Sequence, residues 1–178
     1  MVVSLRRADS IRPPGAFARA YAAFAATAFA RFVSRHVNWK LDPLLLRVTR
    51  GRLASTLVFP TALLETTGVR SGERRRNAVI YVPDGDRFVI VASNAGAAHH
   101  PAWLHNLRAH PEVTFGGNPM VAAEVDDPAE RERLQAATDR AFPTFARYRH
   151  DATATGRTIP IVVLTPVPSA LGRQNPAR

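Results

Sequence analysis

The fold follows from one stretch of the sequence: Asn77-Ala78-Val79-Ile80-Tyr81-Val82, then Pro83-Asp84-Gly85-Asp86, then Arg87-Phe88-Val89-Ile90-Val91-Ala92. Two apolar runs rich in valine and isoleucine flank four residues with the chemistry of a hairpin turn. Because hairpin-linked strands dominate and strands do not alternate regularly with helices, we expect a mainly β protein with peripheral helices (α+β), built as an antiparallel barrel or sheet. The other expected strands are Ala62–Thr66, Glu112–Phe115, Met120–Val125 and Ile159–Leu164.

Short helices are expected around these strands. One covers residues 128–141, with Pro128 at its first position and Asp127 as its cap. Glu130 is placed to complete a capping box with Asp127. The other expected helices are Pro101–His110 and Thr144–His150.

The two ends of the chain differ from this β-rich part. Residues 1–13 form a basic tail, and residues 16–37 carry aromatic and alanine side chains every three or four residues, which predicts an amphipathic helix. This helix either packs against the main domain or in a dimer seam, or lies as an anchor on a membrane surface. We therefore divide the chain into a tail and helix (1–43), a barrel domain (44–166) and a flexible end (167–178).

The composition narrows the classes of function. The chain has 178 residues and no cysteine, which excludes disulfides, zinc–thiolate sites and thiol catalysis. Its formal net charge is +10, and every basic residue except Lys40 is arginine, so an anionic ligand is expected. We find neither a secretory leader nor an apolar run long enough to cross a bilayer, and we expect a cytoplasmic protein.

An arginine-rich segment separates two of the expected strands: Thr66-Thr67-Gly68-Val69-Arg70-Ser71-Gly72-Glu73-Arg74-Arg75-Arg76. Its glycines allow tight turns, its hydroxyl and backbone N–H groups can donate hydrogen bonds, and its guanidinium groups add positive charge. These features suit a phosphate or a phosphodiester tail, although the lysine of a P-loop is missing. The alternative interpretation is a solvated turn with exposed arginines.

A second polar segment comprises Ala92-Ser93-Asn94-Ala95-Gly96 and the histidine-rich stretch 99–111. Trp103 and Asn106 are three residues apart on the expected helix and share a face, so they can wall a planar heterocycle. The alternative is that Trp103 belongs to the core. The histidines at 99, 100, 105 and 110 lack a one-face ligand spacing and a nearby carboxylate, so we expect no metal.

Other catalytic and binding classes find no support in the sequence. A nucleophilic serine elbow and a pair of catalytic carboxylates are both missing. The arginines are not interleaved with aromatic residues along a strand, so a stacking platform for nucleic acid is missing and no nucleic-acid partner is expected.

Four segments in this order and spacing resemble the deazaflavin-dependent nitroreductase family: Thr66-Thr67-Gly68-x-Arg70-Ser71-Gly72; Ala92-Ser93-Asn94-x-Gly96; His100-Pro101-Ala102-Trp103-x-x-Asn106-Leu107-x-Ala109-x-Pro111; and Arg157-Thr158-Ile159-Pro160-Ile161-Val162-Val163-Leu164. The resemblance covers roughly residues 44–166. It implies a split β-barrel, similar to FMN-binding flavin reductases, that binds coenzyme F-420, an 8-hydroxy-5-deazaflavin with a phosphodiester and polyglutamate tail. FMN is the less favoured cofactor. It also implies hydride transfer from the reduced coenzyme to a quinone, an unsaturated ketone or a nitro compound.

The resemblance also implies site residues, position by position. The anionic tail would meet the arginine-rich segment, the ring would lie along two strands, and the short helix would close the pocket. Phe145 would cover the substrate side, and the proton would come from solvent or from Tyr148. The implied cofactor-binding residues are Val69, Arg70, Ser71, Arg75, Arg76, Asn77, Ala78, Val79, Ile80, Val91, Ala92, Ser93, Asn94, Ala102, Trp103, Leu104, His105, Asn106 and Phe145.

Departures from the family pattern leave two functions open. Val69 stands where the family often has a second cation, and Phe142 and Phe145 stand where members active on bulky nitro drugs carry tyrosines. Phenylalanine cannot donate a hydrogen bond to a developing oxyanion. The first function is a reductase acting on a small-molecule acceptor, as a monomer or homodimer. The alternative is a non-catalytic barrel that binds a coenzyme or anion and docks on a membrane or partner.

Overall fold

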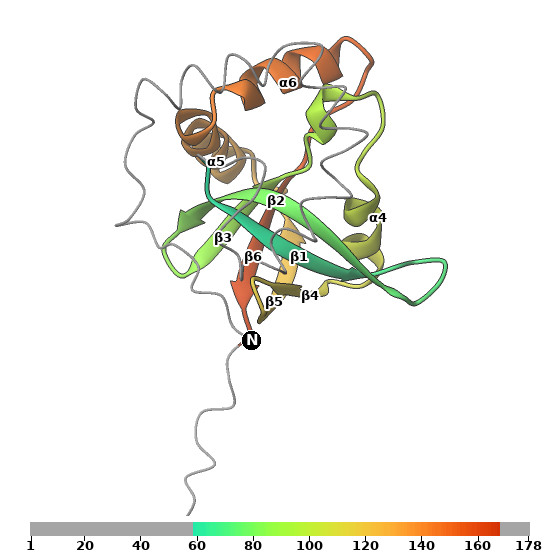
Figure 1. Cartoon of the computed structure of the whole chain (residues 1–178). Coiled ribbons are helices and arrows are strands. Elements are labelled where there is room, and N and C mark those ends of the chain that lie inside the picture. Colours follow the sequence, from blue (N-terminus) through green and yellow to red (C-terminus); the bar gives the residue numbers. More distant parts are fainter. Residues whose placement is uncertain (1–58, 168–178) are drawn as a thin grey trace, which may run out of the picture.

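Antiparallel strands close a six-stranded barrel in the part of the chain that the computed structural model describes, residues 59–167. Around the barrel the strand order is β1-β2-β3-β6-β5-β4 (Figure 1). The mainly β class predicted from the sequence is therefore confirmed. The expected helix at 16–37 and the tail after 167 lie outside the described residues. The elements are β1 (Thr61–Thr67), β2 (Arg74–Asp84), β3 (Arg87–Val91), η3 (Asn94–Gly96), α4 (Ala102–Ala109), β4 (Glu112–Phe115), β5 (Asn118–Glu124), α5 (Pro128–Ala141), α6 (Thr144–Thr153) and β6 (Ile161–Pro166).

Two tight turns set the register of the hairpins. In the β2–β3 hairpin Asp84 pairs with Arg87, which leaves Gly85 and Asp86 as the turn, and Gly85 has φ 62°. The turn is shorter than the four residues expected, because Pro83 and Asp84 remain in the ladder. Between β4 and β5, Gly116 and Gly117 both have positive φ, which suits the primed turns of two-residue hairpins.

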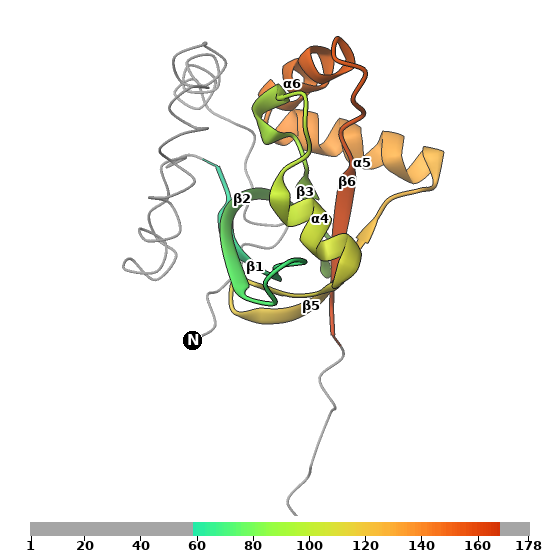
Figure 2. The same ribbon diagram turned by 90° about the vertical axis from the view of Figure 1, so that its right-hand side faces the viewer.

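The barrel interior forms the main hydrophobic core. Alternate residues of the strands point inward, as the pattern of buried and half-buried positions along β1 shows. Leu64, Ile90, Phe115 and Leu164 have no exposed surface. Helix α4 lies across the barrel opening (Figure 2) and inserts Leu104, which is likewise fully buried in this core.

Helices α5 and α6 cover the outside of the barrel and lie together above it in Figure 1. Buried side chains of α6 form a second cluster with Val91 and Phe59. Leu134 of α5 joins a third cluster with Val89 and Ile161, residues of β3 and β6. Each helix therefore covers the outer face of the β2–β3–β6 part of the barrel.

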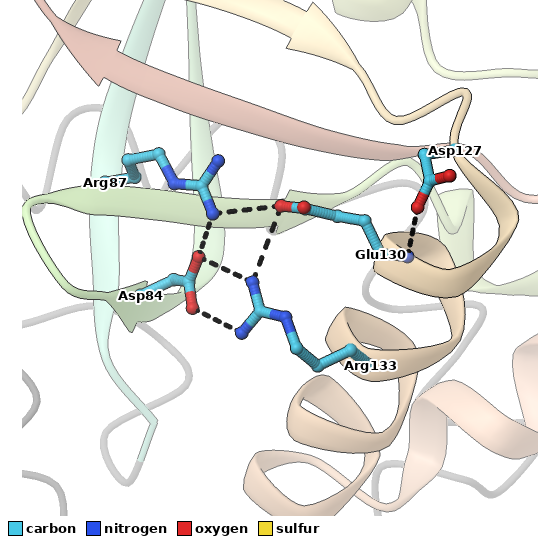
Figure 3. A network of polar contacts seen from close by, with 5 residues as sticks. All are labelled: Asp84, Arg87, Asp127, Glu130 and Arg133. Atoms are coloured by element: carbon cyan, nitrogen blue, oxygen red, sulfur yellow. Dashed lines mark hydrogen bonds and ion pairs between the residues drawn. The ribbon is translucent and has the colours of Figure 1, made fainter.

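An ion-pair network fixes the start of α5 to the β2–β3 turn (Figure 3). Asp127 caps the helix by accepting a hydrogen bond from the Glu130 backbone N–H at 2.7 Å, as predicted. The Glu130 side chain does not complete the expected capping box with Asp127. It accepts a hydrogen bond from Arg87 at 2.9 Å instead, because the β2–β3 hairpin places a guanidinium group beside it. Arg133 donates to both oxygens of Asp84, at 2.8 and 3.0 Å.

We expect the replacement of Asp84 with asparagine to lower the free energy of unfolding by about 1 kcal/mol at neutral pH and by less in acid. Hydrogen bonds from Arg133, then from Arg87, hold the pKa of Asp84 below its ordinary value of 3.8. A carboxyl group whose pKa falls on folding stabilises the protein above its unfolded pKa and loses that effect as the pH falls through the folded pKa. Urea unfolding at about pH 7 and about pH 3 measures the difference. Glu132→Gln, at an exposed position of α5, is the matched control. Equal losses for Asp84→Asn at the two pH values would contradict the expectation.

Candidate functional site

The arginine-rich segment folds as the hairpin turn between β1 and β2. The Gly68 N–H donates to the Glu73 carbonyl and the Gly72 N–H to the Gly68 carbonyl, both at 2.8 Å. A Cβ on Gly68 would lie 3.1 Å from Ser71 Oγ and 3.2 Å from the Glu73 carbonyl oxygen, and Gly72 has φ 66°. The turn therefore favours glycine at both positions, in agreement with the sequence analysis. Figure 1 shows this hairpin projecting beyond the barrel on the side of α4.

Guanidinium groups at the start of β2 already have carboxylate partners. Arg74 and Arg76 lie on one face of the strand, and their Nε atoms are 3.5 and 3.1 Å from the same carboxylate oxygen of Glu65. Arg75 points to the other face and pairs with Glu73 at 2.8 Å. Part of the positive charge predicted to face the coenzyme is therefore neutralised locally, at exposed positions where ion pairs are weak.

Arg70, at the tip of the turn, differs from these three. Its side chain is exposed and makes no ion pair or hydrogen bond within residues 59–167. The backbone N–H groups of Arg70 and Ser71 have no acceptor in the same range. An unengaged guanidinium and two unpaired N–H groups in one turn are donors of the kind that bind phosphate groups. The turn therefore suits the phosphodiester tail of the expected coenzyme.

Asn106 joins this turn to α4. Its Oδ1 accepts a hydrogen bond from the Val69 N–H at 3.2 Å, and its Nδ2 donates to Thr66 Oγ1 at 3.0 Å. Asn106 is 8% exposed and Thr66 is 2% exposed, so the bond between them is shielded from water, whereas the bond to the exposed Val69 is only partly buried. Asn106 therefore joins the turn to the short helix, although the two are about 40 residues apart in sequence. Both the oxygen and the nitrogen of the Asn106 amide are used in these two hydrogen bonds. The observed role of Asn106 is therefore to position the turn.

Strand β2 places the four of its residues that were predicted to line the ring on two opposite faces. Asn77 and Val79 pair with Leu64 and Ala62 and share their inward face, and Val79 packs against the interior core. Ala78 and Ile80 are on the outward face because side chains alternate along a strand, and Ile80 packs against the α6 cluster. One flat ring on one face of β2 can therefore meet only two of the four side chains.

Beside the turn, β2 has an edge that β3 does not cover. The ladder between the two strands runs only from Tyr81 to Asp84 on β2, so Arg74–Ile80 have β1 as their partner in the described sheet. The chain beyond β3 contains Ala92, which is fully buried, and the half-buried Ser93 and Asn94. The resemblance places the ring along this edge of β2 and this segment, and that placement stays a prediction.

Helix α4 contributes two kinds of residue. Trp103 is 6% exposed and Leu104 fully buried, and both belong to the interior core, as the alternative interpretation of Trp103 expects. Ala102 and His105 are exposed. Contact of Trp103 and Leu104 with a coenzyme stays a prediction.

Helix α6 places Phe145 and Tyr148 in a buried aromatic cluster. The ring centroids of Phe142 and Phe145 are 4.9 Å apart, and those of Phe142 and Tyr148 are 6.4 Å apart. Phe145 is 4% and Tyr148 is 8% exposed, and Val91 of β3 belongs to the same cluster. The roles of Phe145 over the substrate and of Tyr148 as proton donor stay predictions.

Two further features were not predicted as parts of the site. The Arg157 guanidinium contacts the carbonyl oxygens of Ala92 and Ser93, 65 and 64 residues away, and no local sequence signal indicates such a contact. A cleft of about 630 Å³ shares His105 with the predicted set and is lined mainly by residues 98–100, 124–126 and 155–160. Within the described residues, no group of three His, Cys, Asp or Glu side chains is arranged to hold a metal ion.

Comparison with known proteins shows which family this sequence matches. The profile of the F420H(2)-dependent quinone reductase family matches residues 40–166. The chain belongs to this family. An F420H(2)-dependent quinone reductase of Mycobacterium tuberculosis (strain H37Rv) is 33% identical over 143 residues, which are 76% of this chain and 96% of that protein. A second protein of that strain, described as a putative F420H(2)-dependent quinone reductase, is 32% identical over 110 residues, 60% of this chain and 90% of that protein.

Solved structures agree with this family. A chain described as an F420-H2 dependent reductase has a TM-score of 0.52 and 31% identity, over 59% of this chain and 93% of that one. Another, described as a domain-swapped dimer, has a TM-score of 0.54 and 26% identity, over 70% of this chain and 96% of that one. The split-barrel fold and the family implied by the sequence are confirmed. In the part of the chain that the structure describes, no helix is long and apolar enough to span a membrane.

Proposed function

We propose that this protein is an oxidoreductase that transfers a hydride from reduced coenzyme F-420 to a quinone. Membership of the F420H(2)-dependent quinone reductase family, over residues 40–166, is the observation that carries the proposal. The structure supports it with a cationic turn next to an uncovered strand edge. These features suit the two ends of a tailed, flat coenzyme.

The residues of this chain would bind and orient the coenzyme. Arg70 and the N–H groups of Arg70 and Ser71 would hold the acidic tail, with Arg75 and Arg76 adding positive charge. Asn106 would keep the turn in place, and the edge of β2 with Ser93 and Asn94 would receive the ring. When bound, the reduced deazaflavin supplies the hydride, so the protein contributes binding, orientation and electrostatics.

On the acceptor side we favour a quinone over a bulky nitro compound. Phe142 and Phe145 present apolar rings without a hydroxyl group, and both are buried with Ile80 and Val91 in one cluster. Neither ring can donate a hydrogen bond, which a developing nitro oxyanion needs, whereas an apolar acceptor suits apolar surroundings. Among the aromatic residues 142, 145 and 148, Tyr148 carries a hydroxyl group, and it is the proposed proton donor. Unsaturated ketones, which also lack a nitro group, are the second class of acceptor to assay.

The non-catalytic barrel stays the alternative function. Its membrane or partner contact depends on the helix expected at 16–37, which lies outside the described residues, and membrane contact and a cytoplasmic location both stay predictions. Turnover distinguishes the two functions, because a binding module would take up the coenzyme without oxidising it in the presence of an acceptor.

A parallel titration of the full chain with F-420 and with FMN tests the proposal. We expect tryptophan fluorescence to saturate with F-420 below about 50 µM, within the usual range for enzyme ligands, and to respond less to FMN. Adding a soluble quinone to the protein and reduced F-420 should then oxidise the coenzyme at a rate proportional to protein concentration. No saturation with F-420 would contradict the proposal, and saturation without turnover would favour the non-catalytic barrel.

A further inference from the structure

Arg157 lies just before β6 and reaches back to the segment that follows β3. Its Nη1 donates to the Ala92 carbonyl at 3.1 Å and its Nη2 to the Ser93 carbonyl at 2.5 Å. The residue is 7% exposed, so this guanidinium is one of the few charged groups buried among the described residues. Its partners are the backbone of two residues in the predicted ring site.

No carboxylate within residues 59–167 pairs with Arg157 to offset its burial, although Glu124 and Asp126 line the same cleft. Within residues 59–167 it makes no ion pair, and its Nε has no hydrogen-bond partner. Its remaining contact is with His100 Nδ1 at 3.2 Å. Burial, followed by the charge of Arg157, lowers the pKa of His100, which keeps that ring neutral and able to accept the hydrogen bond. A buried cation without a counter-ion is costly, so its hydrogen bonds must serve to hold the segment.

The segment that Arg157 holds has an unfavourable backbone. Asn94 and Ala95 have φ 47° and 50°, in the left-handed region that costs non-glycine residues about 1 kcal/mol or more each. Such a conformation persists only when neighbouring structure determines it. On one side Asn94 Nδ2 donates to the His99 carbonyl at 3.0 Å, and on the other Arg157 fixes Ala92 and Ser93.

We propose that Arg157 is a positioning residue for the coenzyme: its guanidinium group clamps the Ala92 and Ser93 carbonyls and so holds Ser93 and Asn94 in the shape that receives the ring. This inference rests on the proposed function for the identity of the ligand. The clamp itself is a property of the protein without ligand. Loosening it should weaken coenzyme binding with little effect on the chemical step.

Arg157→Lys and Arg157→Met test the clamp, with Arg131→Met as the matched control. Arg131 also donates to two backbone carbonyls, those of Val125 and Asp126, and it lines the same cleft, but its hydrogen bonds go to the segment before α5 and not to the one after β3. Lysine keeps the charge and loses the fork of two donors. We expect both Arg157 variants to raise the Kd and KM for F-420 about tenfold, with kcat for a quinone changed less than twofold. Arg131→Met should lower the Tm without changing the Kd.

Hydrogen exchange on the protein without coenzyme gives an independent readout. We expect backbone amides in residues 92–97 to exchange about tenfold faster in Arg157→Lys than in the wild type, and to be unaffected in Arg131→Met. If Arg157→Met does not fold, Arg157→Lys decides. If residues 92–97 of Arg157→Lys exchange at the wild-type rate, the clamp is wrong whether or not the protein binds F-420. A wild-type Kd in Arg157→Lys, when the wild-type protein binds F-420, would overturn the positioning role and leave the proposed function intact.

Discussion

Arg70→Glu is expected to raise the Kd for F-420 by about 30-fold at low salt, because charge-assisted hydrogen bonds to phosphate are among the strongest polar contacts. Arg70 is the guanidinium of the turn that has no partner within residues 59–167. The variant replaces that attraction with repulsion beside the N–H groups of Arg70 and Ser71. Fluorescence titration at about 20 mM and about 300 mM salt measures the change, which should shrink at high salt because ions screen exposed charges.

Arg140→Glu provides the control for this charge reversal. Arg140 is exposed in the last turn of α5, and its replacement changes the net charge by the same amount. We expect its Kd for F-420 to stay within twofold of the wild type. Similar increases in Kd for the two variants would mean that only the overall charge of the protein attracts the coenzyme, and the tail site at the turn would then be wrong.

Most strands of the barrel could be predicted because their signals are local. The expected strand at Glu112–Phe115 is the observed β4, and Gly85, Gly116 and Gly117 occupy the turns that need positive φ. The main error in the strands is the start of β2, three residues earlier than the predicted Asn77. Arg74–Arg76 have weak strand character, but the register with Glu65 and the tight turn before them keep them in the ladder.

The candidate site was predictable only in part, because its decisive contacts are long-range. The hydrogen bond from Val69 to Asn106 and the contacts of Arg157 with Ala92 and Ser93 join residues 37 to 65 positions apart. Spacing along the chain does not indicate such contacts. In contrast, the sequence could have predicted that the ring residues divide between the two faces of β2. The two-residue period of a strand already places Val79 and Ile80 on opposite faces.

Asn106→Ala is expected to lower the free energy of unfolding by about 3 kcal/mol, since it leaves the buried Thr66 hydroxyl and the Val69 N–H without their partner. It should also weaken F-420 binding about tenfold, because the turn that carries Arg70 loses its attachment to α4. Urea unfolding and fluorescence titration measure the two effects. The loss of stability follows from the removed hydrogen bonds alone, so it is expected even if the ligand is not F-420.

Thr66→Val separates the two hydrogen bonds of Asn106. Valine has nearly the same volume as threonine and removes only the bond to Nδ2, while the Val69 N–H keeps its acceptor on Oδ1. We expect a loss of about 1–2 kcal/mol of stability with an unchanged Kd, because the turn stays attached to α4. If Thr66→Val weakens F-420 binding as much as Asn106→Ala does, a general loss of order at the end of β1 would explain the weaker binding of both variants, and the specific role of the Val69 bond would be wrong. If only Asn106→Ala weakens binding, the single bond from the Val69 N–H is what keeps the arginine-rich turn in place for the acidic tail.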